Sequence, residues 1–328
     1  MKNPEILLPF SIPPAELQKD LQKDLRLPAF SRLIGRSDII RHQTQDHFCK
    51  AVAHETWLSG QFPAAADAGS PPVAQERMSD YGLPGGGGHW FVLEPVHIHI
   101  ARDHLVLTDK RLLALDDASA RELFAIASDL AREEGMELLY GDAQTWFLRA
   151  DDWRDLQTAT SDAACGHNID IWMPAGDHAR AWRKLQNDIQ MHWFTHDINQ
   201  QREQSGLRTV NSVWLHSGAA ERHASSRKTA KAPTFQSGTA QAADVILLDT
   251  LISSAINNDW GSWLEQMEAL ERDWFAPALT ALQSGQPSRL DLICTDASSL
   301  IHFRCTPWSL KKFWRSDSVQ RLFGARRP

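Results

Sequence analysis

The chain has 328 residues, of which 42% are hydrophobic and 23% charged, as in an ordinary globular protein. No stretch approaches the roughly 20 apolar residues that a membrane-spanning helix needs, and residues 1–12 match neither a secretory signal nor a transit peptide. A formal net charge of -7 argues against general affinity for nucleic acid, because backbone binding relies on Lys and Arg. We therefore expect a cytoplasmic protein without a membrane or nucleic-acid partner.

Residues 1–61 are predicted to form a helical N-terminal region, because Leu17, Leu21 and Leu25 fall near helical spacing. Residues 62–89 are rich in Pro, Ala, Gly and Ser and end in four consecutive glycines. Such a composition is too flexible for the interior of a helix or strand and predicts a flexible linker or loop.

Residues 90–218 are predicted to form an α/β domain. Apolar runs at 90–93, 96–100 and 105–107 indicate strands, and an amphipathic helix over 119–134 stops at Gly135. A strand at 146–148, a helix that Asp177 can cap, and a strand at 212–215 follow. Strands and helices therefore alternate in this part of the chain.

The last part of the chain begins with a polar stretch. Residues 219–242 lack periodicity and are predicted to be a flexible insertion. Residues 243–328 are predicted to be a C-terminal α/β portion, with strands at 245–248, 290–295 and 300–305 and helices at 260–282 and 309–314. The fold class we expect is α/β, a helical N-terminal region followed by a mixed sheet with helices packed on it.

Cysteine and tryptophan usage favours packing over chemistry. The four cysteines include no pair two residues apart, which gives no indication of a zinc knuckle or a redox motif. The 13 Trp are interpreted as core and interface residues, because Trp buries a large area at low entropy cost. The cysteines, interpreted as buried thiols, are Cys49, Cys165, Cys294 and Cys305.

The most unusual polar residues lie between positions 187 and 218. Amides, an imidazole and a guanidinium at helical spacing could orient a phosphate or a carboxylate. Alternatively, the amides cap helix ends and strand edges while the arginine pairs with a neighbouring acid. The candidate ligand-binding residues are Asn187, Gln190, His196, Asn199, Arg202, Asn211 and Trp214.

This segment resembles the RpfE-type regulatory proteins of plant-pathogenic bacteria. The matching stretches read Asn-Asp-Ile-Gln-Met at 187–191, His-Asp-Ile-Asn-Gln-Gln-Arg-Glu at 196–203 and Asn-Ser-Val-Trp-Leu-His-Ser-Gly-Ala at 211–219. Shorter matches lie at 94–97, 146–149, 273–277 and 313–315, so the resemblance covers most of the chain beyond Trp90. It implies a cytoplasmic, bacterial regulatory protein.

A shorter segment is similar to the archaeal-type cofactor-independent phosphoglycerate mutases. The similarity lies in the His-x2-Asn-x2-Arg pattern that starts at His196, which those enzymes carry in a domain inserted into their metal-dependent catalytic unit. The mutases need an early Asp-Gly-x-x-Asp motif, a nucleophilic Ser or Thr, and late Asp-His pairs, because two divalent cations clamp the phosphoryl group. The sequence has no such set, and Asp177-His178 is interpreted as a helix start.

A second candidate group of metal ligands lies on the predicted strand near position 94. Glu94, His97 and His99 could hold a transition metal, although ordinary polar residues on a strand face explain them more simply. We therefore predict no metal site. No phosphate-binding loop, dinucleotide fingerprint or nucleophile elbow is present in the sequence.

Three functions remain as hypotheses. The leading one is a regulatory protein without autonomous catalysis that binds a small phosphorylated metabolite or a protein partner and needs no cofactor. The alternative is a phosphoglycerate-mutase-like isomerase or phosphotransferase, which would require a divalent metal. The second alternative is a protein-interaction module that uses a Trp-rich surface.

Overall fold

A computed structural model describes residues 3–65, 67–85, 87–222, 227–232, 234–235 and 245–323, and it confirms the predicted α/β fold. The chain divides into two compact units. Unit 1 comprises Met1–His47 and Arg227–Pro328, and unit 2 comprises Phe48–Ser226. Unit 2 is therefore inserted into the sequence of unit 1.

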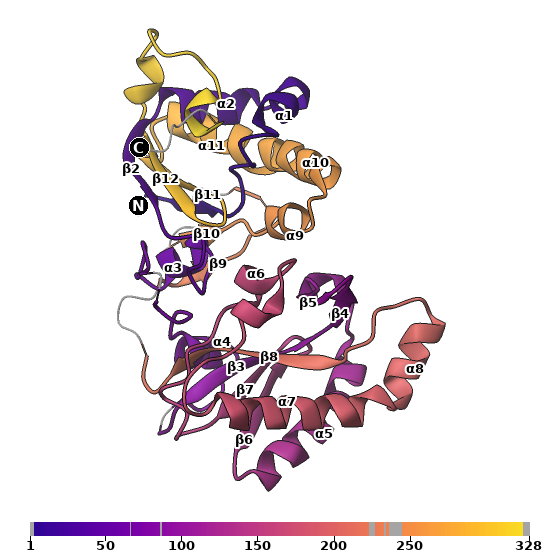
Figure 1. The fold of residues 1–328 in the computed structure, drawn as a ribbon. Helices are drawn as coiled ribbons and strands as arrows, with labels where there is room; N and C mark the ends of the chain where they lie inside the picture. Colours follow the sequence, from indigo (N-terminus) through magenta and orange to yellow (C-terminus); the bar gives the residue numbers. More distant parts are fainter. Residues whose placement is uncertain are drawn as a thin grey trace. The chain divides into compact units, whose positions relative to one another are not determined.

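Unit 1 contains a six-stranded mixed sheet in the order β2-β12-β11-β1-β10-β9 (Figure 1). The central strand β1 runs parallel to both of its neighbours, whereas β12 is antiparallel to β11 and to β2. The strands are β1 (Glu5–Leu8), β2 (Asp38–Thr44), β9 (Thr229–Ala230), β10 (Val245–Leu247), β11 (Leu290–Thr295) and β12 (Ser299–Cys305).

The prediction that residues 1–61 are helical is therefore wrong at β1 and β2. Strand β1 is only four residues long and almost wholly buried between β10 and β11, so it shows neither helical nor alternating periodicity. Its pairing partners lie more than 200 residues away in the sequence. Local pattern could not reveal a strand whose stability comes from such distant neighbours.

Helices of unit 1 pack on one face of this sheet, and α2, α10 and α11 contribute much of its hydrophobic core (Figure 1). The Phe30 and Phe275 rings lie 4.5 Å apart between centroids in this core. The helices are α1 (Gln18–Asp24), α2 (Pro28–Arg36), α9 (Leu251–Ile256), α10 (Trp260–Leu270), α11 (Ala276–Gln283), α12 (Gln320–Phe323) and the 3-10 turn η5 (Ser309–Lys311).

The helix predicted over 260–282 is interrupted by a π-helical turn, η4 (Glu271–Phe275). Pro277 has no backbone N–H and cannot donate to the Asp273 carbonyl, which accepts from the Phe235 N–H at 3.0 Å instead. The helix predicted over 309–314 is shorter than expected, since only Ser309–Lys311 is helical. Beyond it, Arg315 and Lys312 bind Asp38 of β2, which holds the chain away from a helical path.

Unit 2 contains a four-stranded antiparallel sheet in the order β6-β7-β3-β8 and a separate hairpin, β4-β5. Strand β6 has no counterpart in the predicted elements. The strands are β3 (Trp90–Val96), β4 (Ile98–Ala101), β5 (His104–Leu107), β6 (Glu137–Asp142), β7 (Thr145–Arg149) and β8 (Ser212–Ala219).

Two long helices, α5 and α7, lie side by side and cover one face of this sheet (Figure 1). Helix α5 begins where the Asp116 side chain accepts from the Ser119 N–H, and it ends before Gly135, whose φ of 75° few other residues adopt. The helices of unit 2 are α3 (Ala53–Leu58), α4 (Ala74–Asp80), α5 (Asp117–Glu133), α6 (Ser161–Ala164), α7 (Ala179–Phe194), α8 (Asp197–Gln204) and the 3-10 turns η1 (Lys110–Leu112) and η2 (Ile169–Ile171).

Most tryptophans pack in the cores, as predicted, and Trp146, Trp182 and Trp193 are almost fully buried. The four cysteines, all among the described residues, are buried and form no disulfide. The predicted linker 62–89 contains helix α4, which packs against β3 and β8. Half of the predicted insertion 219–242 lies outside the described residues, and its described part contains the end of β8 and strand β9. Within the described chain, no helix is both long and apolar enough to cross a membrane.

Candidate functional site

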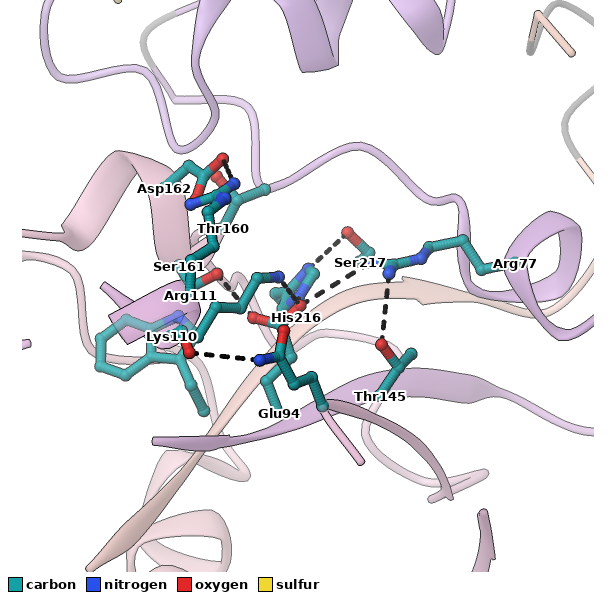
Figure 2. A network of polar contacts seen from close by, with 12 residues as sticks. Arg77, Glu94, Lys110, Arg111, Thr145, Thr160, Ser161, Asp162, His216 and Ser217 are labelled. Carbon is teal, nitrogen blue, oxygen red and sulfur yellow. Dashed lines mark hydrogen bonds and ion pairs between the residues drawn. The ribbon is translucent and has the colours of Figure 1, made fainter. Parts of the chain in front are cut away.

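A fully buried carboxylate, Glu94, lies at the centre of a polar network in unit 2 (Figure 2). Strand β3 carries Glu94 into the sheet between β7 and β8, where every residue of the strand is buried. An isolated carboxylate is costly to bury, so its partners must come from the elements packed around β3. Those elements are α4, η1, α6 and β8.

Four side chains contact the Glu94 carboxylate. The Lys110 ammonium donates to Oε1, and the Ser161 hydroxyl donates to Oε2 at 2.5 Å. His216 Nε2 lies 3.2 Å from Oε1, and the Arg77 guanidinium lies 3.7 Å from the same oxygen. Both oxygens of Glu94 therefore have close partners.

The charges of this network are strongly coupled. Burial by itself would raise the pKa of Glu94, but Lys110, His216 and Arg77 outweigh burial and hold that pKa well below its usual range. Burial lowers the pKa of His216, and the attraction of Glu94 opposes this effect. Glu94 is consequently an anion that Lys110, Arg77 and His216 surround.

Strand β8 brings a second hydrogen-bonded pair into the network. His216 Nδ1 lies 2.8 Å from the Ser217 hydroxyl, and Ser217 adopts a φ of 58°, which is uncommon for a residue with a side chain. The Ser217 N–H donates to the Ser70 hydroxyl at 2.8 Å, which stabilises this conformation. The next position requires glycine, because a Cβ at Gly218 would overlap the Phe91 ring.

A separate cluster of charges adjoins Ser161. Arg111 donates to both carboxylate oxygens of Asp162, at 2.9 and 2.7 Å, and to Asp109 at 2.9 Å. Nearby, Glu55 accepts from the Thr160 hydroxyl at 2.6 Å. Burial raises the pKa of Glu55 to about 7, and the charge of Asp162 adds to this effect.

His54, Glu55 and Asp162 each place one ligand atom within 4.8 Å of the other two, the one such group of His, Cys, Asp and Glu among the described residues. Imidazole and carboxylate groups at this separation can hold a divalent cation. Both oxygens of Asp162 already accept from Arg111, however, so a cation would compete with that ion pair. The donor set is thus a poor fit to a resident metal.

The balance of charge differs between the two clusters. Arg111 pairs with two carboxylates, Asp109 and Asp162, whereas Arg77 and Lys110 share the one carboxylate of Glu94. The Arg77 side chain is 32% exposed and that of Lys110 is 17% exposed. Counted by itself, the Glu94 cluster has an excess of about one positive charge, whereas the adjoining Arg111 cluster has an excess of about one negative charge, and the charge of Lys110 also acts on Asp162.

The structure does not bring the seven predicted ligand residues into one site. Asn187 and Gln190 are exposed on α7, whereas Asn199 and Arg202 are buried on α8. The Asn199 amide donates to the carbonyls of Trp193 and Val210, both at 2.9 Å, and accepts from the Val210 N–H at 2.8 Å. Asn199 thereby joins the start of α8 to the chain that enters β8.

The other predicted ligand residues also bond to the main chain. Arg202 donates to the carbonyls of Arg208, at 2.8 Å, and Leu113. Asn211 makes two 2.8 Å hydrogen bonds to the backbone of Ile98, and Trp214 donates to the Ala159 carbonyl at 2.8 Å. His196 caps α8. Ligand binding by these residues stays a prediction, since their described hydrogen bonds serve the fold.

The candidate metal ligands Glu94, His97 and His99 do not share a site, because they contact different partners. Glu94 faces Lys110 and His216, while His97 and His99 stack on each other with ring centroids 5.9 Å apart. His97 Nδ1 lies 2.9 Å from the Thr209 carbonyl oxygen, and His99 Nδ1 lies 3.2 Å from the Thr108 hydroxyl. No metal-binding arrangement of these three is present in the described structure.

Sequence reasoning missed most of the network. Arg77 lies in the segment interpreted as a linker, and Lys110 and Ser161 lie between predicted elements. One signal was available: Glu94 is the only charged residue in the apolar run Trp90–Val96, and a charge in a buried strand needs a partner. The sequence does not indicate which residues supply it.

Comparisons with known proteins show only distant similarity. No protein-family model matches the chain, and no curated protein matches it, so the resemblance to RpfE-type proteins gains no support. A cofactor-independent phosphoglycerate mutase from Thermoplasma acidophilum is similar in structure, with 13% identity and a TM-score of 0.39 over 93% of this chain and 90% of that one. The PH0037 protein from Pyrococcus horikoshii has 10% identity and a TM-score of 0.47, over 93% and 87% of the two chains.

Proposed function

We propose that this protein binds a small anion, such as a phosphorylated or carboxylated metabolite, at Arg77 and Lys110, and that it does so without catalysing a reaction. The observation that carries the proposal is that two cations share the single carboxylate of Glu94. Two cations converge on one carboxylate, and both remain partly exposed. Guanidinium and ammonium groups in this setting favour anions.

The contacts of Arg77 support its role as the principal ligand residue. Within the described part of the chain its guanidinium makes only long contacts, at 3.7 Å to Glu94 and 3.5 Å to the Thr145 hydroxyl. Arginine offers five N–H donors in a planar fork, so donors remain for an oxyanion. The Lys110 ammonium already donates to Glu94, so it would attract an oxyanion by its charge and would not add a second pair of N–H donors.

The same geometry supports a binding role over a mutase-like one. Phosphoryl transfer of that type requires a metal-activated nucleophile. The Ser161 hydroxyl already donates to Glu94, and Ser217 is 1% exposed. Neither hydroxyl is placed for attack on a substrate from solvent. A regulatory role of the RpfE type is compatible with anion binding but rests on sequence resemblance alone.

Calorimetric titration with inorganic phosphate and with 3-phosphoglycerate tests the proposal. We expect Arg77→Gln to weaken anion binding by about tenfold or more, the effect of losing one charge-assisted hydrogen bond. Arg121→Gln is the matched control, because Arg121 lies in the same unit, 61% exposed and paired with Asp117.

Equal loss in both variants, or no anion binding by the folded wild-type protein, would contradict the proposed site. A mutase assay with Mn²⁺ tests the second part of the proposal. Metal-dependent interconversion of phosphoglycerates that Arg77→Gln abolishes would overturn the non-catalytic reading.

A further inference from the structure

The outer strand of the unit 1 sheet, β2, has an unpaired edge. Among the described residues β2 pairs only with β12, which lies on its inner side. Ile39 is 38% exposed and Ile40 is 48% exposed, although both are large aliphatic residues. An edge of this kind presents backbone N–H and C=O groups that another strand can bind.

A bulge changes which way the β2 side chains point. The register with β12 shifts between His302 and Phe303, so that Ile301 faces His42 and Phe303 faces Ile39. The extra residue in β2 places Ile39 and His42 on the same face of the sheet, which regular alternation would not do. This face is the one that Ile301 and Phe303 present to the core of unit 1.

A groove of about 710 Å³ lies against that face of β2, within the size range of small-ligand and peptide sites. Its described lining comes from α1, β2 and α12 and comprises Gln18, Lys19, Gln22, Ile39, His42, Gln320, Arg321 and Phe323. Two of these residues are permanent cations, three are amides, and none is acidic. The groove thus combines hydrogen-bonding groups, a small apolar surface and positive charge.

The wider charge distribution has the same sign. By sequence, unit 1 has 19 Lys and Arg against 16 Asp and Glu, whereas unit 2 has 15 against 25. Burial lowers the pKa of Arg321, the charge of Arg315 lowers it further, and the charge of Asp38 opposes both effects. An anionic group in the groove would offset this repulsion between cations.

We propose that β2 and the adjoining groove bind an extended acidic segment of a partner protein, which pairs with the free edge of β2 as an additional strand. Alternate side chains of such a strand point to the same face as Ile39 and His42, and therefore toward the groove. Acidic side chains there would meet Lys19 and Arg321. This interaction surface is independent of the anion site proposed in unit 2.

A partner of different chemistry fits these observations better than a second copy of the chain. Pairing two copies through β2 would bring together two units that each carry a positive excess, with Arg41 and His42 on both strands. Cationic side chains on both edges would also repel each other in a pair of identical strands. Charge complementarity selects an acidic segment.

Fluorescence anisotropy with a labelled hexapeptide of alternating Glu and Val, titrated with the full-length protein, tests the proposal. We expect saturable binding that Lys19→Glu weakens by about tenfold, because one contact changes from attraction to repulsion. Lys23→Glu is the matched control, since Lys23 lies one turn further along α1, outside the groove, and should change affinity by less than about twofold.

Two altered peptides separate strand pairing from simple charge attraction. In an extended peptide, alternate N–H groups point to opposite edges. One peptide is therefore N-methylated at its odd positions and another at its even positions, and the one methylated on the edge that faces β2 should not bind. Replacing Glu by Lys should abolish binding as well. Retention of affinity by every N-methylated peptide, or self-association of the protein that the peptide does not reverse, would overturn the proposal.

Discussion

At the scale of single residues, the network around Glu94 shows how a buried charge is stabilised by its surroundings. Glu94 is fully buried, yet its pKa is held low because cations contact it from helices and turns outside its own strand. Removing one member of such a pair leaves an uncompensated charge in a poorly solvated place. The stability of unit 2 should therefore depend strongly on this carboxylate.

We expect Glu94→Ala to lower the free energy of unfolding by about 3 kcal/mol or more, because Lys110 and Arg77 would lose their shared partner. Urea denaturation followed by circular dichroism measures the change. Asp129→Ala is a suitable control, since Asp129 forms an ion pair with Arg132 that is about 70% exposed at both side chains. That change should cost less than about 1 kcal/mol.

Glu55 should make stability dependent on pH. Its pKa rises from an ordinary value of 4.5 to about 7 in the folded protein, so the folded state binds a proton more tightly than the unfolded state. Its contribution is complete below pH 4.5 and is lost as the pH rises through 7. In the wild-type protein, the loss of this contribution lowers the unfolding free energy between pH 5 and pH 8. We expect this decrease to be smaller by about 1 to 3 kcal/mol in Glu55→Gln. An unchanged pH profile would show that another group titrates.

At the scale of elements, the polar residues between 187 and 218 join α7, α8 and β8 through the backbone. The Asn199 side chain binds three backbone groups, the carbonyls of Trp193 and Val210 and the N–H of Val210. These groups lie outside regular helices and strands or at their ends, where the usual backbone partners are missing. Buried amides used in this way substitute for missing secondary-structure bonds. The type and spacing of these residues therefore agree with a role in capping helix ends and strand edges as well as with ligand binding.

Asn199→Ala should lower the free energy of unfolding by about 2 to 4 kcal/mol, because three buried backbone groups would lose their partner. Gln200→Ala, at an exposed position of the same helix, should change it by less than about 0.5 kcal/mol. Thermal unfolding compares the two variants. If Asn199→Ala instead leaves stability unchanged and abolishes phosphate binding, the ligand-binding alternative is correct.

At the scale of the whole molecule, each unit has its own hydrophobic core. The largest cluster in unit 1 is built from residues before position 48 and after 226, and that in unit 2 from residues between 91 and 215. A continuous segment that contains a complete core can fold by itself. Unit 2 meets this condition although it interrupts the sequence of unit 1.

Residues 48–226 expressed as a separate chain should therefore fold cooperatively. We expect a single thermal transition and dispersed amide resonances, because the four-stranded sheet, α5 and α7 all lie within this segment. Calorimetry and NMR spectroscopy provide the measurements. A chain of these residues with no transition would mean that unit 2 depends on unit 1 for its stability.

The amino-acid sequence by itself determined the α/β class, the strands β3, β7 and β11 and the amphipathic helices, because these elements carry their own hydrophobic pattern. It also indicated Glu94 as an oddity in a buried strand. It did not reveal β1, whose four residues become a strand only between partners far along the chain. Nor did it reveal that Arg77, Lys110 and His216 converge on Glu94, since they come from three elements that only packing brings together. Pattern within a segment encodes local structure and burial, whereas the placement of charges around a buried group depends on contacts between distant segments.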